Sequence, residues 1–220
     1  MVKITKKDLN PNIYISEGNI KLKRNDSSYF LIWSLPSQIT CPYATEQCKE
    51  SCYAKKAERQ YKQVLPCRQR NLQETHKKSF VADMVQAITY YVNLPKNKGK
   101  QAYFRIHEAG DIYSLSYLYK WIEIAQRLPD VIFTAYTKSV KFIDAVYNDI
   151  PENLVIRYSI WDDTSQKDVQ LARRLRLPIF TAKDKTELYT LPEYSICPND
   201  CSICKKCYSN NYHKIAIAIH

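Results

Sequence analysis

The stretch that decides the fold is AYFRIHEAGD, residues 102–111. It begins with a short, mainly apolar run, Ala102 to Ile106, and a histidine, a glutamate and an aspartate follow at once. Such a run predicts a strand that is buried in a sheet. Because ligands of parallel sheets bind at the carboxyl ends of the strands, the residues from His107 to Asp111 are candidates for chemistry.

Short apolar runs alternate with helical patterns on both sides of this stretch. The predicted strands cover residues 29–33, 102–106, 131–135, 154–158, 178–181 and 214–220, and the predicted helices cover residues 115–128, 140–147 and 166–175. This alternation indicates parallel strands joined by helical crossovers, and the strands are too few for a closed eight-stranded barrel. The sequence therefore predicts an α/β fold, a partial (β/α)6-type barrel or open parallel sheet with a C-terminal cysteine-cluster segment.

The chain is expected to form one domain, because no linker rich in Gly, Ser or Pro divides it. Within residues 1–220 the expected parts are an N-terminal hairpin and first strand (1–35), a cysteine loop and basic helix (41–67), the βα repeats (101–190), and a C-terminal cysteine cluster with the last strand (193–220). The hairpin would pair residues 13–15 with residues 20–23. Pro66 is expected to end one helix, and a second helix should cover residues 68–92.

The residues directly after the predicted strands are unusually polar. The candidates for chemistry are His107, Glu108 and Asp111 after the second strand, Lys138 after the third, Ser159 after the fourth and Lys183 after the fifth. Helix capping explains Asp163, Thr164 and Ser165, but it does not explain His107 or Lys138. The structural alternatives are a hydrogen-bonded histidine and solvated lysines at the strand ends.

The chain holds 8 cysteines, and in a reducing compartment these are metal ligands or redox groups rather than disulfides. One loop after the first strand carries Cys41, Cys48 and Cys52, and a second group near the C-terminus comprises Cys197, Cys201, Cys204 and Cys207. Cys67 is a possible fourth ligand for the first loop, although a lone cysteine near a helix start is more often simply buried. The close C-terminal spacing favours a [4Fe-4S] cluster, with zinc as the alternative metal.

The formal charge of +11 is uneven, since residues 1–100 carry +10 and residues 101–220 carry +1. This asymmetry favours a polyanionic partner, DNA or RNA. Basic residues interleave with Tyr53 and Tyr61, and the predicted nucleic-acid contacts are Lys55, Lys56, Arg59, Lys62, Arg68 and Arg70. Tyrosines in such a patch can stack on unpaired bases. The alternative is a solvated basic surface.

Composition excludes several classes of protein. With 45% hydrophobic and 25% charged residues the chain is not disordered, and its 3 glycines exclude a Gly-rich phosphate loop. The apolar stretches are far shorter than the ~20 residues of a membrane span. The N-terminus MVKITKKDLN has no apolar signal core. We therefore expect a cytoplasmic protein without a membrane partner, and the sequence leaves its oligomeric state open.

The first cysteine loop resembles that of the radical S-adenosylmethionine (radical SAM) enzymes, which follows the first strand of a six-stranded partial barrel. The spacing departs from theirs, because six and three residues separate the cysteines here in place of three and two. Ala109-Gly110-Asp111 resembles the Gly-Gly-Glu motif that receives the amino group of the cofactor's methionine part. The resemblance implies a cluster with one open iron and S-adenosylmethionine as cofactor, with Gly110, Asp111 and Ser159 as the cofactor-binding residues.

A second resemblance covers most of the chain. TCP at residues 40–42, CYA at 52–54, RIHEAGDIYS at 105–114, YTKS at 136–139 and RYS at 157–159 resemble the phage and plasmid proteins called the gene product eighty-eight family. This resemblance implies a mobile-element protein in a bacterial host cell, which agrees with a function that involves nucleic acid. It names no reaction.

Two functions from different classes follow. The first is an iron-sulfur enzyme of radical SAM type acting on a nucleic acid or nucleotide, with catalytic roles for His107, Glu108, Asp111, Lys138 and Lys183. The second is a non-enzymatic nucleic-acid-binding protein whose iron-sulfur or zinc sites are structural. An open coordination position at the first cysteine loop separates the two, and a fourth ligand such as Cys67 would exclude the radical enzyme.

Overall fold

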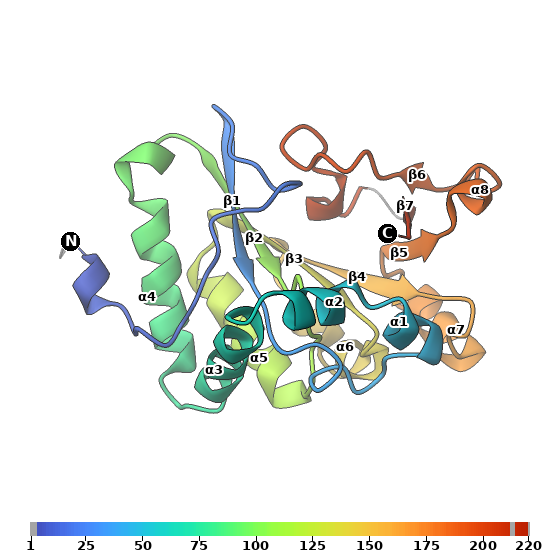
Figure 1. Cartoon of the computed structure of the whole chain (residues 1–220), viewed down its shortest axis with the longest axis horizontal. Helices are drawn as coiled ribbons and strands as arrows, with labels where there is room; N and C mark the ends of the chain where they lie inside the picture. The colour runs from blue at the N-terminus through green and yellow to red at the C-terminus, as the bar shows by residue number, and fades with distance from the viewer. Residues whose placement is uncertain (1–3, 212–213, 220) are drawn as a thin grey trace.

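A parallel sheet forms the centre of the protein in the computed structural model. The structure describes residues 4–211 and 214–219. The sheet has 7 strands in the order β1-β2-β3-β4-β5-β7-β6 (Figure 1). Their bounds are β1 (Ser28–Trp33), β2 (Gln101–Ile106), β3 (Val131–Thr137), β4 (Leu154–Ile160), β5 (Ile179–Lys183), β6 (Ser195–Ile196) and β7 (Lys214–Ala218). The first five strands lie side by side in chain order, so the sheet winds in one direction and curls into a half-barrel. The predicted partial barrel or open parallel sheet is confirmed.

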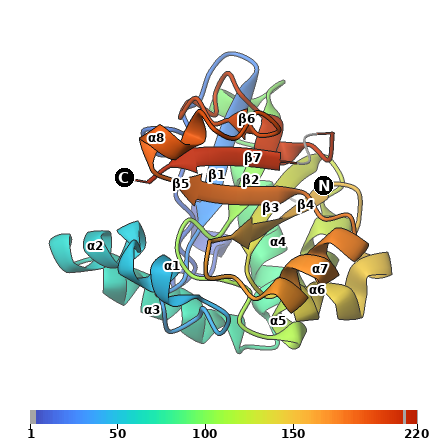
Figure 2. The same ribbon diagram turned by 90° about the vertical axis from the view of Figure 1, so that its right-hand side faces the viewer.

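Helices cover one face of the sheet, namely α4 (Phe80–Val92), α5 (Leu115–Arg127), α6 (Val140–Val146) and α7 (Gln166–Arg174) (Figure 2). Alternate strand residues point into this layer, where Trp33 and Phe104 pack against Trp121 of α5. Every residue of β1 is buried, as expected for a strand covered on both faces. The main hydrophobic core therefore lies between the sheet and these helices.

Loops from the two ends of the chain cover part of the opposite, concave face. Phe30 of β1, Tyr103 of β2 and Tyr208 form an aromatic cluster there, with ring centroids 4.9 to 5.8 Å apart. The backbone N–H of Cys201 donates to the carbonyl of Lys21 over 2.9 Å. The C-terminal cysteine segment is thus packed into the half-barrel as a cover on its inner face.

Four α-helices lie between β1 and β2, because α1 (Glu46–Glu50), α2 (Tyr53–Gln60) and α3 (Val64–Thr75) precede α4. Pro66 does not end a helix, as predicted, but lies in the first turn of α3, where a missing N–H costs no hydrogen bond. The single helix predicted over residues 68–92 is also wrong, since residues 76–79 separate α3 from α4.

The expected N-terminal hairpin is absent from the described residues. Ser16 instead makes an isolated antiparallel bridge to Ile32, and the Asn19 side chain accepts from the N–H groups of Lys21 and Leu22 to close a turn. The two-residue strand β6 was not predicted, and His220 of the predicted last strand lies outside the described residues. The remaining elements are α8 (Lys185–Leu188) and the 3-10 helices η1 (Lys6–Asp8), η2 (Pro95–Asn97), η3 (Tyr147–Asp149) and η4 (Lys206–Tyr208).

Among residues 4–211 and 214–219, none of the helices combines the length and the apolar character that crossing a membrane requires.

Candidate functional site

A cavity of about 470 Å³ lies at the carboxyl ends of the strands and along the concave face. Its walls come from the first cysteine loop, from the ends of β2 to β5 and from the C-terminal segment. Six cysteines line it, namely Cys41, Cys48, Cys52, Cys197, Cys201 and Cys207. The two cysteine groups, which lie at opposite ends of the chain, therefore face one shared space.

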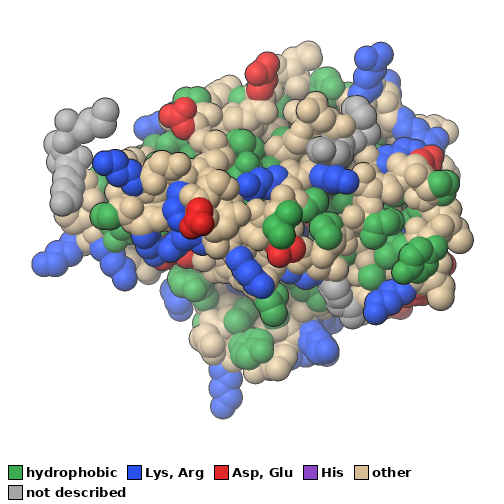
Figure 3. Space-filling model, turned by 90° about the horizontal axis from the view of Figure 1, so that it is seen from above, with side chains coloured by type: hydrophobic (Ala, Val, Ile, Leu, Met, Phe, Trp, Pro, Cys, Tyr) green, Lys and Arg blue, Asp and Glu red, His purple; other side chains and the backbone are tan. Residues whose placement is uncertain are grey.

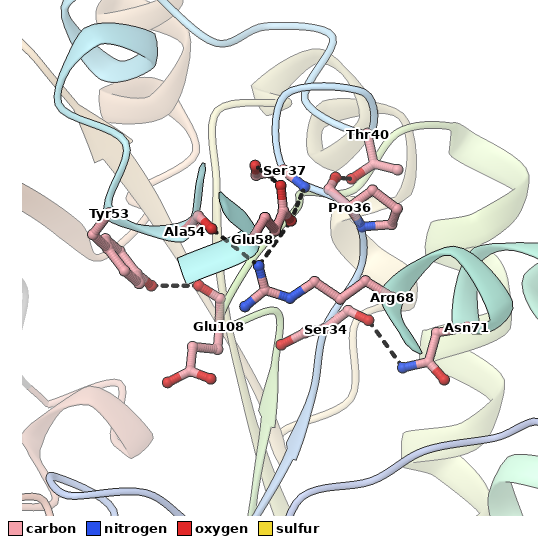
Figure 4. A network of polar contacts seen from close by, with 10 residues as sticks. All are labelled: Ser34, Pro36, Ser37, Thr40, Tyr53, Ala54, Glu58, Arg68, Asn71 and Glu108. Carbon is pink, nitrogen blue, oxygen red and sulfur yellow. Dashed lines mark hydrogen bonds and ion pairs between the residues drawn. The ribbon is translucent and has the colours of Figure 1, made fainter. Parts of the chain in front are cut away.

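A buried ion pair anchors the start of the first cysteine loop (Figure 4). The Arg68 guanidinium on α3 donates to the Glu58 carboxylate on α2 over 2.8 Å, and both side chains are 9% exposed. The same carboxylate accepts from the backbone N–H and the hydroxyl of Ser37, over 2.8 and 2.6 Å. Burial would raise the pKa of Glu58, but the Ser37 and Arg68 hydrogen bonds hold it below its ordinary value. The loop thus leaves β1 in a position fixed by α2 and α3.

The helix that carries Cys48 is tied to the loop after β4. The Asp163 carboxylate accepts from the backbone N–H of Gln47 in α1 over 2.9 Å, and the Gln47 side chain accepts from the backbone N–H of Asp162 over 3.0 Å. Capping was predicted for Asp163, Thr164 and Ser165, and Ser165 does occupy the N-cap position of α7, although its side chain makes no cap bond. The prediction is wrong for Asp163, which binds α1, and for Thr164, whose hydroxyl accepts from the Trp161 N–H.

Polar groups from the ends of three strands meet beside Cys48. The Asp111 carboxylate accepts from the backbone N–H groups of Ile112 and Lys138, over 2.6 and 3.0 Å. The Lys138 ammonium donates to the Ser159 hydroxyl over 2.9 Å and also hydrogen-bonds Cys48. Burial raises the pKa of Asp111 and lowers that of Lys138, where the neighbouring Cys48 and Asp111 charges oppose the effect. The expected convergence of Asp111, Lys138 and Ser159 is therefore present in the structure.

Burial also suppresses ionisation of the cavity thiols. It raises the pKa of Cys41 to about 12 and that of Cys201 to about 11. The Cys41 charge is further disfavoured by Asp111 and by the other two thiols of its loop, while the Lys138 ammonium partly offsets burial at Cys48. Thiolates in this cavity need a positive partner, which a bound metal centre provides.

His107 lies at the cavity wall but is neutral. Its backbone has φ 68°, in the left-handed region, and its Nε2 atom is 2.9 Å from the Tyr117 hydroxyl. The Trp33 indole donates to the same hydroxyl over 3.0 Å, so Trp33, Tyr117 and His107 form one buried hydrogen-bonded chain. Burial, and then the Arg105 charge, lower the pKa of His107 to about 3. A proton-donating imidazolium is therefore not present at neutral pH.

Glu108 and Gly110 belong to the turn that packs on the cysteine loop. The Glu108 carboxylate accepts from the Asn19 amide over 2.5 Å, and its carbonyl accepts from the Tyr53 hydroxyl. Gly110 has φ 85°, and a Cβ atom there would lie 2.6 Å from Thr40 Oγ1 and 2.7 Å from Leu35 Cβ. Gly110 lines the cavity, but its missing Cβ makes room for the cysteine loop.

Three of the predicted catalytic and metal-binding residues do not line this cavity. The Lys183 ammonium pairs with Asp162 at the end of β5. The Cys67 thiol lies on α3 and hydrogen-bonds Arg70, and Cys204 borders a separate surface hollow. Within the described residues, Cys67 is thus not gathered with the three thiols of the first loop.

The predicted nucleic-acid residues lie on α2, on α3 and, for Lys62, on the turn between them. Lys56, Arg59, Lys62 and Arg70 are exposed, Lys55 is half-buried, and Arg68 is buried in its ion pair with Glu58. Tyr53 and Tyr61 are about half exposed between them, at 51% and 49%. Basic side chains also spread over the face seen in Figure 3, where acidic ones are few. Five of the six residues can therefore reach solvent, and Arg68 cannot.

Sequence reasoning missed three residues on the inner face of the half-barrel, Arg105, Tyr136 and Arg157. The Arg105 guanidinium lies over the Tyr136 ring, with Cζ 4.4 Å from the ring centroid. Arg157 donates to the backbone carbonyls of Lys206, Cys207 and Ser209. A signal was available, because a charged residue inside an apolar strand must have a partner or a ligand.

Among residues 4–211 and 214–219, no three or more Cys, His, Asp or Glu side chains are arranged to hold a metal ion. The donor set of the first loop still has the chemistry of a cluster site, since three soft thiols line one cavity and would leave a fourth position to another ligand. A cubane cluster also holds its thiolates farther apart than a single tetrahedral ion does. The residues present are therefore compatible with the cluster that the sequence implies.

Comparison with known proteins identifies the family. A family model described as Gene product 88 matches residues 13–185. The chain belongs to this family. The Gene 88 protein of Mycobacterium phage L5 is 28% identical over 124 residues, which are 55% of this chain and 52% of the relative. The Gene 88 protein of Mycobacterium phage D29 is 31% identical over 103 residues, which are 46% of this chain and 43% of the relative.

The chain spans about half the length of these curated phage relatives. No solved structure matches it. The resemblance to the gene product eighty-eight family is thus confirmed, whereas the resemblance to radical SAM enzymes rests on the residues of this chain alone.

Proposed function

We propose that this phage-family protein is an iron-sulfur enzyme of radical SAM type that acts on a nucleic acid or nucleotide. The observation that carries the proposal is the meeting of the first cysteine loop with Asp111 and Lys138 on one cavity at the carboxyl ends of a parallel half-barrel. Parallel barrels place their chemistry at this end. The wall formed by the C-terminal cysteines supports a second cluster site on the inner face.

In this proposal Cys41, Cys48 and Cys52 would hold a [4Fe-4S] cluster with one open position for S-adenosylmethionine. When bound, this pair supplies an electron for reductive cleavage and a radical that abstracts hydrogen. The Asp111 carboxylate would accept a hydrogen bond from the cofactor's amino group, because a carboxylate has about four acceptor sites and this one bonds the Ile112 and Lys138 N–H groups and the Thr137 side chain. The Lys138 ammonium would stabilise the Cys48 thiolate and keep Ser159 oriented.

The other predicted catalytic residues have more limited parts. His107 is neutral and would act only as a hydrogen-bonding group. Glu108 lines the cavity with its carboxylate bonded to Asn19, and it would be an acid-base candidate there. Lys183 would reach the mouth only after leaving Asp162.

Anaerobic reconstitution with iron and sulfide tests the enzyme. Reduction in the presence of S-adenosylmethionine should yield 5′-deoxyadenosine, and serine at Cys48 should abolish the product. The matched control is Cys67→Ser, which removes a thiol outside the cavity and should leave cleavage unchanged. Zinc as the sole bound metal, or a reducible cluster that gives no cleavage, would refute the radical enzyme.

A second candidate is a nucleic-acid-binding protein with structural metal sites. The observation that favours it is the exposed basic face of α2 and α3, whose residue Tyr53 also lines the cavity. Affinity for single-stranded DNA or RNA should fall steeply with salt, with a slope of about −0.7 per phosphate contact. Changing Arg59 and Lys62 to Gln should reduce the slope of log affinity against log salt concentration by the equivalent of about one to two phosphate contacts. Changing the exposed Arg127 and Lys167 to Gln should leave this slope unchanged. A flat response of the wild-type chain to salt would exclude this candidate.

A further inference from the structure

Arg105 and Arg157 both lie on the inner face of the half-barrel, but they differ in the hydrogen bonds that their guanidinium groups make. Arg157 is fully buried and bonds three backbone carbonyls of the C-terminal segment. Arg105 is half-buried, and its Nε donates to the His107 carbonyl over 3.3 Å. Within residues 4–211 and 214–219 its two terminal nitrogens make neither a hydrogen bond nor an ion pair. A guanidinium in this setting retains its planar pair of donors for another group.

The surroundings of Arg105 hold the guanidinium in place rather than neutralise it. The Tyr136 ring lies against one face, with Cζ 4.4 Å from its centroid, and Phe180 packs on Tyr136 in turn. The Glu108 carboxylate also acts on the Arg105 charge, but its hydrogen bond goes to Asn19. A desolvated cation without a bonded anion is costly unless a ligand supplies the anion.

The other charged side chains of the cavity balance one another, because Lys21 and Lys138 stand against the carboxylates of Glu108 and Asp111. Arg105 therefore gives the cavity a formal excess of one positive charge. Arg105, Tyr136 and Phe180 come from β2, β3 and β5, so the position is built on the sheet and not on a loop. The cavity volume of about 470 Å³ matches a small ligand rather than a polymer segment.

We infer that Arg105 is an anion-binding residue that holds the oxyanion of a small ligand inside the cavity through its two terminal nitrogens. The inference rests on the proposed function only in assigning that oxyanion to the phosphate of a nucleotide substrate. A carboxylate, like a phosphate, offers the guanidinium two oxygens that can accept from both terminal nitrogens. The tests below therefore separate a phosphate from the carboxylate of an amino acid cofactor.

The test uses the full chain, reduced and without metal, titrated with inorganic phosphate, a nucleoside monophosphate and methionine. The monophosphate should bind most tightly, and Arg105→Met should weaken it by at least about tenfold, with Arg105→Lys intermediate because it keeps the charge but loses the planar pair. Arg59→Met on α2 is the control and should not change the affinity. Tighter binding of methionine would assign the site to a cofactor carboxylate instead of a substrate phosphate.

A measurement on the unchanged chain covers the case in which the Arg105 variants do not fold. Phenylglyoxal modifies accessible guanidinium groups, and peptide mass spectrometry reports each one. The monophosphate should protect Arg105 and not Arg59, and equal modification of Arg105 with and without ligand would overturn the inference. Because no iron and no S-adenosylmethionine are present, this result is independent of whether the radical chemistry occurs.

Discussion

The two cysteine groups face the same cavity, but the molecule holds them by different kinds of contact. The first loop is fixed by side-chain carboxylates, namely Glu58 at its start and Asp163 at the helix that carries Cys48. The C-terminal group is fixed through its backbone, whose carbonyls accept from Arg157 and Thr134. Carboxylates titrate and a guanidinium does not. Acid should therefore loosen the first group while the second stays in place.

The largest effect is expected at Arg157, the main contact of the C-terminal group. Arg157→Met removes the hydrogen bonds to the carbonyls of Lys206, Cys207 and Ser209, although Thr134 still donates to that of Cys207. A hydrogen bond to a charged group contributes about 1.5–3 kcal/mol, so the free energy of unfolding should fall by about 3 kcal/mol or more. Iodoacetamide labelling of the reduced, unloaded chain should rise at Cys201 and Cys207 and not at Cys48.

The matched control is Arg105→Met, which removes the other inner guanidinium but none of the bonds to the C-terminal segment. It should leave the labelling of Cys207 unchanged. If both variants exposed the C-terminal thiols equally, the backbone contacts of Arg157 would not be what holds the group.

The next effect concerns the first loop alone. Gly110→Ala puts a Cβ atom 2.6 Å from Thr40 Oγ1 and 2.7 Å from Leu35 Cβ at a φ of 85°. Overpacking and left-handed strain together should lower the free energy of unfolding by about 2–4 kcal/mol and increase the labelling of Cys41 and Cys48. Gly99→Ala is matched in φ, at 74°, but meets no atom within 4 Å, so it should cost only ~1 kcal/mol. Equal losses would show that strain, not contact with the cysteine loop, decides the effect.

The difference between the groups also shows what sequence reasoning could reach. The strands and helices of the βα repeats follow from local apolar runs, and their positions agree with the structure to within about three residues. The meeting of Asp111, Lys138 and Ser159 follows from the same rule, because the carboxyl ends of parallel strands share one edge.

The contacts that hold the cysteines could not be predicted, because they join distant parts of the chain. Asn25 donates to the Ser202 carbonyl across 177 positions, and Asp163 accepts from Gln47 across 116. No local pattern distinguishes an aspartate that caps its own helix from one that binds another. Arg157 did carry a local signal, since it is a charge in the middle of an apolar strand.

The two cysteine groups should also differ, by a smaller effect, in how their stability depends on pH. Glu58 has a lowered pKa, because the Ser37 and Arg68 hydrogen bonds outweigh burial. Its ion pair therefore stabilises the fold fully above the ordinary carboxyl pKa of about 4.3, and the contribution is lost as the pH falls through the lower folded value. Between about pH 5 and pH 3 the wild-type chain should lose more stability in urea than Glu58→Gln does.

Labelling assigns this loss to one cysteine group. Glu58→Gln should cost about 1–2 kcal/mol at neutral pH, as expected for a hydrogen bond to a charged group. Pulse labelling after brief acid exposure should reach Cys41 before Cys207 in the wild-type chain. The reverse order would mean that the C-terminal segment opens first, which would contradict the comparison.

The smallest effect is expected at Asp163, which tests whether Cys48 depends on a contact made from the far side of the cavity. Asp163→Ala removes the acceptor of the Gln47 N–H, and because the carboxylate is exposed the free energy of unfolding should fall by only ~0.5 kcal/mol. Labelling should rise at Cys48 and stay constant at Cys41, whose own N–H donates to the Gln38 carbonyl over 3.2 Å. Asp168→Ala on α7 removes a carboxylate that makes no bond to α1 and is the control. Equal labelling of Cys48 in both variants would mean that the Asp163 contact does not protect this thiol, and that Lys138 alone does.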